Sequence, residues 1–176
     1  PSARGGVPTH VFFSDSSVAM NLSRWWPVGL VVIIVAVGVA PAQAQQSIIE
    51  ARDEPLGTEV TVEGTVTRAY GAYARIQDES GPTGASAIVI RQTSGSNSMV
   101  FQDAIEAGEI QPGTTLEVTG STSAFNGIIQ INNDDLGSFE VKAQGEPPSP
   151  PTVTLEYLSQ NGEEYESELL RIEGLR

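Results

Sequence analysis

Alternation of apolar and polar residues predicts five short strands in the centre of the chain. The segment 58–67 places Val60, Val62 and Val66 two or four positions apart, which is the period of a half-buried strand. Gly64 interrupts the alternation. A glycine inside a strand marks a bulge or a sharp bend, as a strand shared by two sides of a small barrel requires. Four further segments have strand-like patterns: 73–78, 85–91, 114–123 and 127–132.

One segment between these strands has a helical period instead. Phe101, Ala104, Ile105 and Gly108 fall at helical spacing within 98–108. Gly108 is a natural stop, so we expect a helix of about ten residues that ends there. In 73–78 the alternation turns Ala74 and Ile76 to one face of the strand.

The elements therefore follow the order strand, strand, strand, helix, strand, strand. This is the order of an OB-fold, a five-stranded Greek-key β-barrel with one short helix between its third and fourth strands. An immunoglobulin-like sandwich would need more strands and no central helix. We expect an all-β domain of this class, with one short helix, over residues 45–143.

Residues 20–44 have the pattern of a secretory signal peptide. A short basic start containing Arg24 precedes the apolar run 28–40, and a small-x-small cleavage site follows at Ala42 and Ala44. The run is shorter than the roughly 20 apolar residues that span a bilayer, so a permanent anchor is the weaker interpretation. We expect cleavage after Ala44, with no stable membrane span afterwards and a secreted or cell-surface location.

Two other segments are expected to lie outside the barrel. Residues 1–19 show no periodicity and are expected to precede the natural start at Met20. The Pro-rich segment 144–152 is a stiff linker. Residues 153–176 are expected to begin a further, truncated domain of a longer protein. Residues 171–174 resemble residues 60–64 of the first barrel strand, which indicates a second OB-fold.

The chain is strongly acidic. It contains 22 Asp and Glu against 9 Lys and Arg, a net charge of −13. Without the first 44 residues the acidic count loses Asp15 and the basic count loses Arg4 and Arg24, which leaves 7 − 21 = −14. Lys142 is the only lysine. This balance repels polyanions at long range and is also typical of proteins from salt-loving organisms.

Composition excludes most catalytic and metal chemistry. There is no cysteine, and the only histidine, His10, precedes the expected cleavage site. Thiolate zinc sites, cysteine nucleophiles and Ser-His-Asp catalysis are therefore excluded from the mature chain. The acidic pairs near Asp78 and at 132–135 supply too few oxygen ligands for calcium and are expected to be solvated turns. We expect no metal, no cofactor and no catalytic site.

The outer face of the second and third strands, with the adjoining loops, is where OB barrels bind single strands. Aromatic and basic side chains gather there in the predicted layout. Stacking on such rings is worth about 1–3 kcal/mol per base. The alternative is that the tyrosines only cover the barrel mouth. The candidate ligand-binding residues are Arg68, Tyr70, Tyr73, Arg75, Gln77, Arg91 and Phe125.

Four segments carry a resemblance to a known family: 56–66, 76–81, 112–120 and 125–131. They resemble the OB-fold domains near the N-termini of secreted bacterial nucleases and related extracellular or surface proteins. The resemblance implies a nucleic-acid-binding accessory module, with hydrolysis in a separate downstream domain. Nothing in this chain resembles that catalytic domain, so we expect a module that is not an enzyme.

Two hypotheses about function follow. In the first, the chain is a secreted, non-catalytic OB-fold module that binds single-stranded nucleic acid and serves an extracellular nuclease-type protein. In the second, it is an extracellular spacer or adhesion module that binds a glycan or a protein and no nucleic acid. In both, the downstream domains of the parent protein are partners. The stiff linker and the expected second copy favour the spacer, whereas the resemblance favours the nucleic-acid binder.

Overall fold

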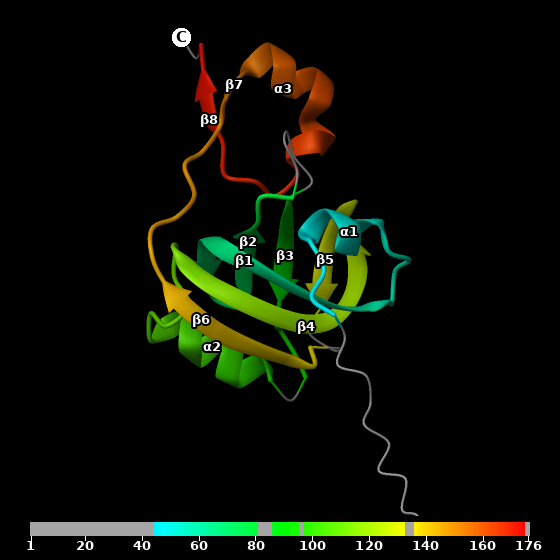
Figure 1. Cartoon of the computed structure of the whole chain (residues 1–176), viewed down its shortest axis with the longest axis vertical. Coiled ribbons are helices and arrows are strands. Elements are labelled where there is room, and N and C mark those ends of the chain that lie inside the picture. The colour runs from blue at the N-terminus through cyan, green and yellow to red at the C-terminus, as the bar shows by residue number, and fades with distance from the viewer. Residues whose placement is uncertain (1–43, 81–85, 96, 133–135, 175–176) are drawn as a thin grey trace, which may run out of the picture. The chain divides into compact units, whose positions relative to one another are not determined.

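The computed structural model describes residues 44–80, 86–95, 97–132 and 136–174 (Figure 1). The predicted leader other than Ala44, the upstream segment and the predicted turn residues 133–135 lie outside the described residues. No helix among the described residues is long and apolar enough to cross a membrane.

The predicted strands and helix are all present, with ends that differ by a few residues. Two short elements in the same region, α1 and β6, were not predicted. The barrel region contains α1 (Ile48–Asp53), β1 (Glu59–Tyr70), β2 (Tyr73–Gln77), β3 (Ala87–Arg91), α2 (Ser98–Glu106), β4 (Thr114–Phe125), β5 (Ile128–Asn132) and β6 (Ser138–Gln144).

The strands close into a barrel because β1 pairs at both of its ends. Its first half lies antiparallel to β4, from Glu59 opposite Ser121 to Thr65 opposite Thr115. Its second half lies antiparallel to β2. The ring runs β1-β2-β3-β5-β4 and returns to β1, with a parallel pairing of β3 and β5. This strand order, with α2 between β3 and β4, is the predicted OB-fold.

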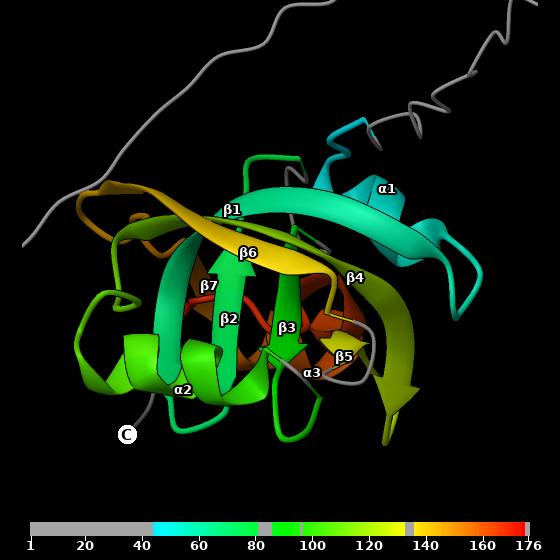
Figure 2. The ribbon, with the colours of Figure 1, turned by 90° about the horizontal axis from the view of Figure 1, so that it is seen from below.

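The barrel is filled by the inward residues of its strands. Ala74 and Ile76 are buried, which confirms the predicted facing of β2. Phe101 of α2 is fully buried and meets Phe139 of β6 edge to face, with ring centroids 5.2 Å apart. Figure 2 shows α2 across one end of the barrel. The main strand residues of this core are Val60, Val62, Val66, Ile88, Ile90, Leu116, Val118 and Ile131.

The bulge in β1 lies near Gly64 but not at it. Pairing with β4 runs through Gly64 without interruption, and the register shifts against β2 between Val66 and Arg68. Gly64 has a different role: a Cβ there would lie 3.0 Å from the carbonyl oxygen of Gln77. The glycine lets the backbone of β2 cross β1 closely at the point where β1 passes from one partner to the other.

The unpredicted helix α1 is six residues long, too short to show a helical period in the sequence. Ser47 and Glu50 form a capping box at its start. The carboxylate of Asp78 accepts the backbone N–H of Ile48 at 2.7 Å. Asp78 is therefore part of a tertiary contact and not, as predicted, a solvated turn.

The unpredicted strand β6 pairs with the edge of β4 outside the closed ring. Phe139 and Val141 alternate with polar neighbours and pack against the core from this strand. That alternation was the signal that could have revealed it.

The C-terminal region is a small unit of β7 (Thr152–Thr154), α3 (Leu155–Asn161), the 3-10 helix η2 (Gly162–Tyr165) and β8 (Arg171–Glu173). Its two strands pair in parallel. Residues 145–151 contain no helix or strand and lead into it from β6. Its assignment to a second OB-fold stays a prediction.

We predict that Gly64→Ala lowers the free energy of unfolding by about 1–3 kcal/mol, because the new methyl group meets the backbone of Gln77 and cannot be accommodated by a side-chain shift. Thermal or urea unfolding measures this change. Gly137→Ala is the matched control: its Cβ would make ordinary contact with Thr119, so a change within about 0.5 kcal/mol is expected. Equal stabilities of the two variants would contradict the close crossing.

Candidate functional site

The bulge at Thr67 decides which side chains reach the outer face of β1. Before it, Val62 and Val66 point into the core. Without the extra residue, Arg68 and Tyr70 would continue in that inward register. Because the register shifts, Arg68 lies opposite Arg75 and Tyr70 lies opposite Tyr73, and both are exposed.

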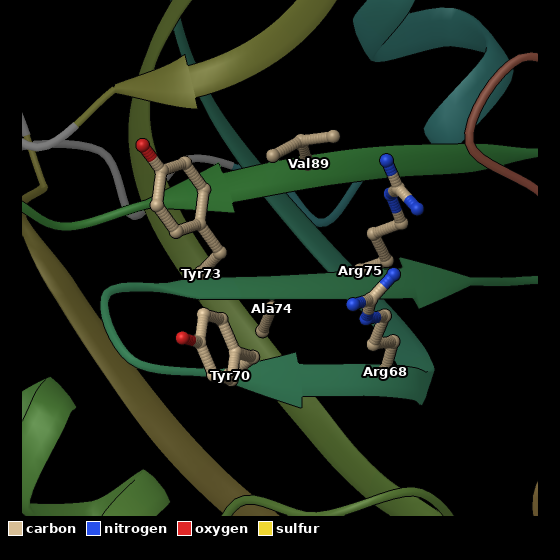
Figure 3. Close-up of a pocket in the computed structure, with 6 residues that line it drawn as sticks. All are labelled: Arg68, Tyr70, Tyr73, Ala74, Arg75 and Val89. Carbon is tan, nitrogen blue, oxygen red and sulfur yellow. The ribbon is translucent and has the colours of Figure 1, made fainter.

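The outward residues of β1, β2 and β3 then form two rows across the sheet (Figure 3). The first row is Arg68, Arg75 and Val89. The second row is Tyr70, Tyr73 and Arg91. An open pocket of ≈ 180 Å³ lies over these rows, with Val89 and Ala74 among the residues that line it. It is smaller than the usual small-molecule site of roughly 300–1,000 Å³, so the surface suits a ligand that lies along it.

Arg91 joins Phe125 to this surface. Its guanidinium carbon lies 5.8 Å from the centroid of the Tyr73 ring and 5.5 Å from that of Phe125. Its Nε donates a hydrogen bond of 3.2 Å to the Tyr73 hydroxyl. Cation–π contacts of this kind hold both rings in place.

The three rings are partly open to solvent. Tyr70, Phe125 and Tyr73 have exposed fractions of 73%, 57% and 43%. Tyr70 and Phe125 expose more than half of their surface and Tyr73 somewhat less than half, so all three rings offer area to solvent. The structure therefore brings six predicted residues onto one surface, which we call the aromatic-arginine face: Arg68, Tyr70, Tyr73, Arg75, Arg91 and Phe125.

Gln77, the seventh predicted residue, lies on the same side of β2, one row beyond Arg75, but it is contacted by the C-terminal region. Its side-chain oxygen accepts the backbone N–H of Leu169 at 3.2 Å. The C-terminal region thus occupies the position that was predicted to contact ligand. The sequence carried no signal for this contact, because the two residues are 92 positions apart.

The cations of the described residues divide into two groups. Lys142 pairs with Glu140 at 2.8 Å and with Glu117 at 3.2 Å, and these hydrogen bonds hold the pKa of Lys142 above its ordinary value. Arg52 pairs with Glu166 at 2.8 Å.

Arg68, Arg75 and Arg91 have no carboxylate within salt-bridge distance in the part of the chain that the structure describes, and neither has Arg171 of β8, which lies outside the aromatic-arginine face. In so acidic a chain, the three arginines of this face, which lack a carboxylate partner among the described residues, give it a local positive charge. No group of three or more His, Cys, Asp or Glu in the described ranges is placed to hold a metal ion.

Comparison with known proteins gives likeness at the level of fold. No family model matches the chain, and no curated protein matches it. The hypothetical protein YgiW from E. coli aligns at 14% identity over 57% of this chain and 89% of its own, with a TM-score of 0.39. The telomere capping protein Ten1 from Saccharomyces pombe aligns at 15% identity over 57% of this chain and 81% of its own, with a TM-score of 0.36.

A third likeness covers a small part of a larger protein. Aspartyl tRNA synthetase from Entamoeba histolytica aligns at 18% identity over 61% of this chain and 23% of its own, with a TM-score of 0.44. These likenesses are weak, and the assignment of the OB-fold rests on the strand order and closure described above.

We predict that replacing Arg75 and replacing Arg52 change the free energy of unfolding in different ways. Arg75→Gln removes the repulsion between two arginines placed directly opposite each other, so at low salt the free energy of unfolding should stay the same or rise by up to about 1 kcal/mol. Arg52→Gln should lower it by about 3 kcal/mol, because Glu166 and the carbonyl of Ala87 lose a largely buried partner. Urea unfolding tests both, and a destabilisation by Arg75→Gln as large as that by Arg52→Gln would contradict a ligand-facing role.

Proposed function

We propose that this chain is a secreted, non-catalytic OB-fold module that binds single-stranded nucleic acid on the aromatic-arginine face. The observation that carries the proposal is the gathering of three exposed rings and three arginines, which have no carboxylate partner among the described residues, on one surface of a chain with a net charge of −13. Such groups are what a single strand requires of its binding surface.

The two rows of side chains suit two parts of a nucleotide, its base and its phosphate. Adjacent rows on a strand are two residues apart, a distance of about 7 Å. Tyr70 and Tyr73 can therefore stack on bases while Arg68 and Arg75, one row away, reach the backbone phosphates. Stacking tolerates every base, so we expect little sequence preference.

The overall charge shapes how this binding depends on salt. With three arginines at the site, the logarithm of the binding constant should fall with the logarithm of salt concentration with a slope of about −2 at most. Added salt also screens the repulsion between the acidic surface and the polyanion. We therefore expect binding that persists at high salt because stacking supplies much of it.

The test is a fluorescence-anisotropy titration of residues 45–176 with a labelled single-stranded oligonucleotide, at low and high salt. Replacing Tyr70, Tyr73 and Phe125 together by alanine should weaken binding at least tenfold, since each base stack contributes about 1–3 kcal/mol. Tyr157→Ala removes a ring of α3 that is as exposed as that of Tyr73 and should leave the affinity unchanged. Equal affinities of the triple variant and the unchanged chain would remove the proposed face.

The extracellular part of the proposal is supported by the pattern of residues 20–44 and by the resemblance to domains of secreted nucleases. We expect the protein recovered from the medium of an expressing bacterial culture to begin at Gln45. N-terminal sequencing or intact mass measures this directly. A product that stays in the cell and keeps residues 20–44 would contradict secretion.

The second candidate is an extracellular spacer or adhesion module that binds a glycan or a protein. The observation that favours it is the segment 145–151, which leaves the barrel without helix or strand and contains four prolines. A labelled oligosaccharide in the same titration separates the two functions. Saturable binding of the sugar together with no binding of the oligonucleotide would establish this second function.

A further inference from the structure

The aromatic-arginine face is closed at one end by the C-terminal region. Tyr73, Arg75 and Gln77 follow each other on the outer side of β2, and Leu169 donates its backbone N–H to the side chain of Gln77. The row that would come after Arg68 and Arg75 is therefore covered by the segment 166–169. We call this segment the end stop.

The end stop is fastened by two carboxylates. Glu168 accepts hydrogen bonds from the backbone N–H and the hydroxyl of Ser86, at 3.2 and 2.7 Å, just before β3. Glu166 accepts from Arg52 at 2.8 Å and from the backbone N–H of Ile129 at 3.1 Å. The side chains of Arg52 and Glu166 have exposed fractions of 11% and 14%, so this contact is shielded from solvent.

The charges next to the end stop are unbalanced. Arg68 and Arg75 are directly opposite each other on β1 and β2, and like charges in this relation destabilise a sheet. Figure 3 shows the two arginines at one end of the pocket and the two tyrosines at the other. The anion that would relieve this repulsion must therefore sit at the closed end of the face.

We propose that the face takes the end of a single strand, with a terminal phosphate held by Arg68 and Arg75 and the adjacent bases stacked on Tyr70 and Tyr73. This inference rests on the proposed nucleic-acid function. A strand that enters over the tyrosines reaches the arginines last and meets the end stop beyond them. A terminal phosphate carries about −1.5 to −2 charges near neutral pH, whereas an internal phosphodiester carries one. It also offers more oxygens to two guanidinium groups, which have five N–H donors each.

The experiment compares ligands of one sequence that differ only at their ends. A labelled linear oligonucleotide with a phosphate at one end binds residues 45–176, and four competitors are added in turn: the 5′-phosphorylated, the 3′-phosphorylated and the unphosphorylated linear strand, and the circularised strand. We expect one phosphorylated strand to compete at least tenfold better than the unphosphorylated strand. We expect the circle, which has no end, to be the weakest competitor.

Two variants that each remove one arginine charge test which arginine is responsible for the preference for a terminal phosphate. Arg75→Gln should reduce the advantage of the terminal phosphate to less than about twofold while the rings still bind the unphosphorylated strand. Arg171→Gln removes the same charge from β8, outside the face, and should keep the full advantage. Thermal unfolding confirms that both variants are folded.

The outcomes separate this inference from the function on which it rests. If all four strands compete equally and the triple ring variant binds weakly, the face binds nucleic acid along its length and the end-binding inference is overturned. If Arg171→Gln loses the preference as fully as Arg75→Gln, the preference reflects overall charge and the assignment to this pair is wrong. If no oligonucleotide binds at all, the proposed function fails and this inference fails with it.

Discussion

The pairing of β1 with two partners is the constraint on which the rest of the structure depends. One strand of twelve residues lies against β4 with its first half and against β2 with its second half. This closes the ring and leaves no free edge between its first and last strands. The exchange of partners requires the backbones to cross closely, which Gly64 permits because it has no side chain. The positions of the core residues, of α2 at the end of the barrel and of the outer face all follow from this crossing.

The outer face depends on the same strand a few residues later. The extra residue at Thr67 reverses the facing of the remainder of β1, so Arg68 and Tyr70 leave the core register and join the outward residues of β2. A single inserted position thus turns the end of β1 into part of the aromatic-arginine face. Bulges commonly have this role beside functional sites because they re-aim side chains without disturbing the sheet.

The cations of the described residues differ in whether a glutamate pairs with them. Arg52 pairs with the distant Glu166, and Lys142 pairs with the distant Glu117 and with its neighbour Glu140, whereas the arginines of the aromatic-arginine face have no such partner among the described residues. The same acidic side chains that dominate the composition also fasten the C-terminal region onto the barrel through Glu166 and Glu168. The C-terminal region thereby sets the length of the face.

The sequence by itself determined the five strands and the central helix of the barrel, because hydrophobic period is a local property of the chain. It also identified six residues that share a surface, since the order of elements implies the OB-fold and the fold implies the face. It did not reveal α1, which is too short to show a period. It also did not reveal β6, although the alternation of apolar and polar residues in that strand is present in the sequence.

Tertiary structure alone decided the rest. The position of the bulge depends on how β1 meets two strands far apart in sequence, so the alternation around Gly64 located it only approximately. The placement of Arg91 between two rings and the covering of Gln77 by Leu169 are contacts across long separations. Such contacts leave no local pattern in a single sequence, because each residue type is compatible with many partners and packing selects one.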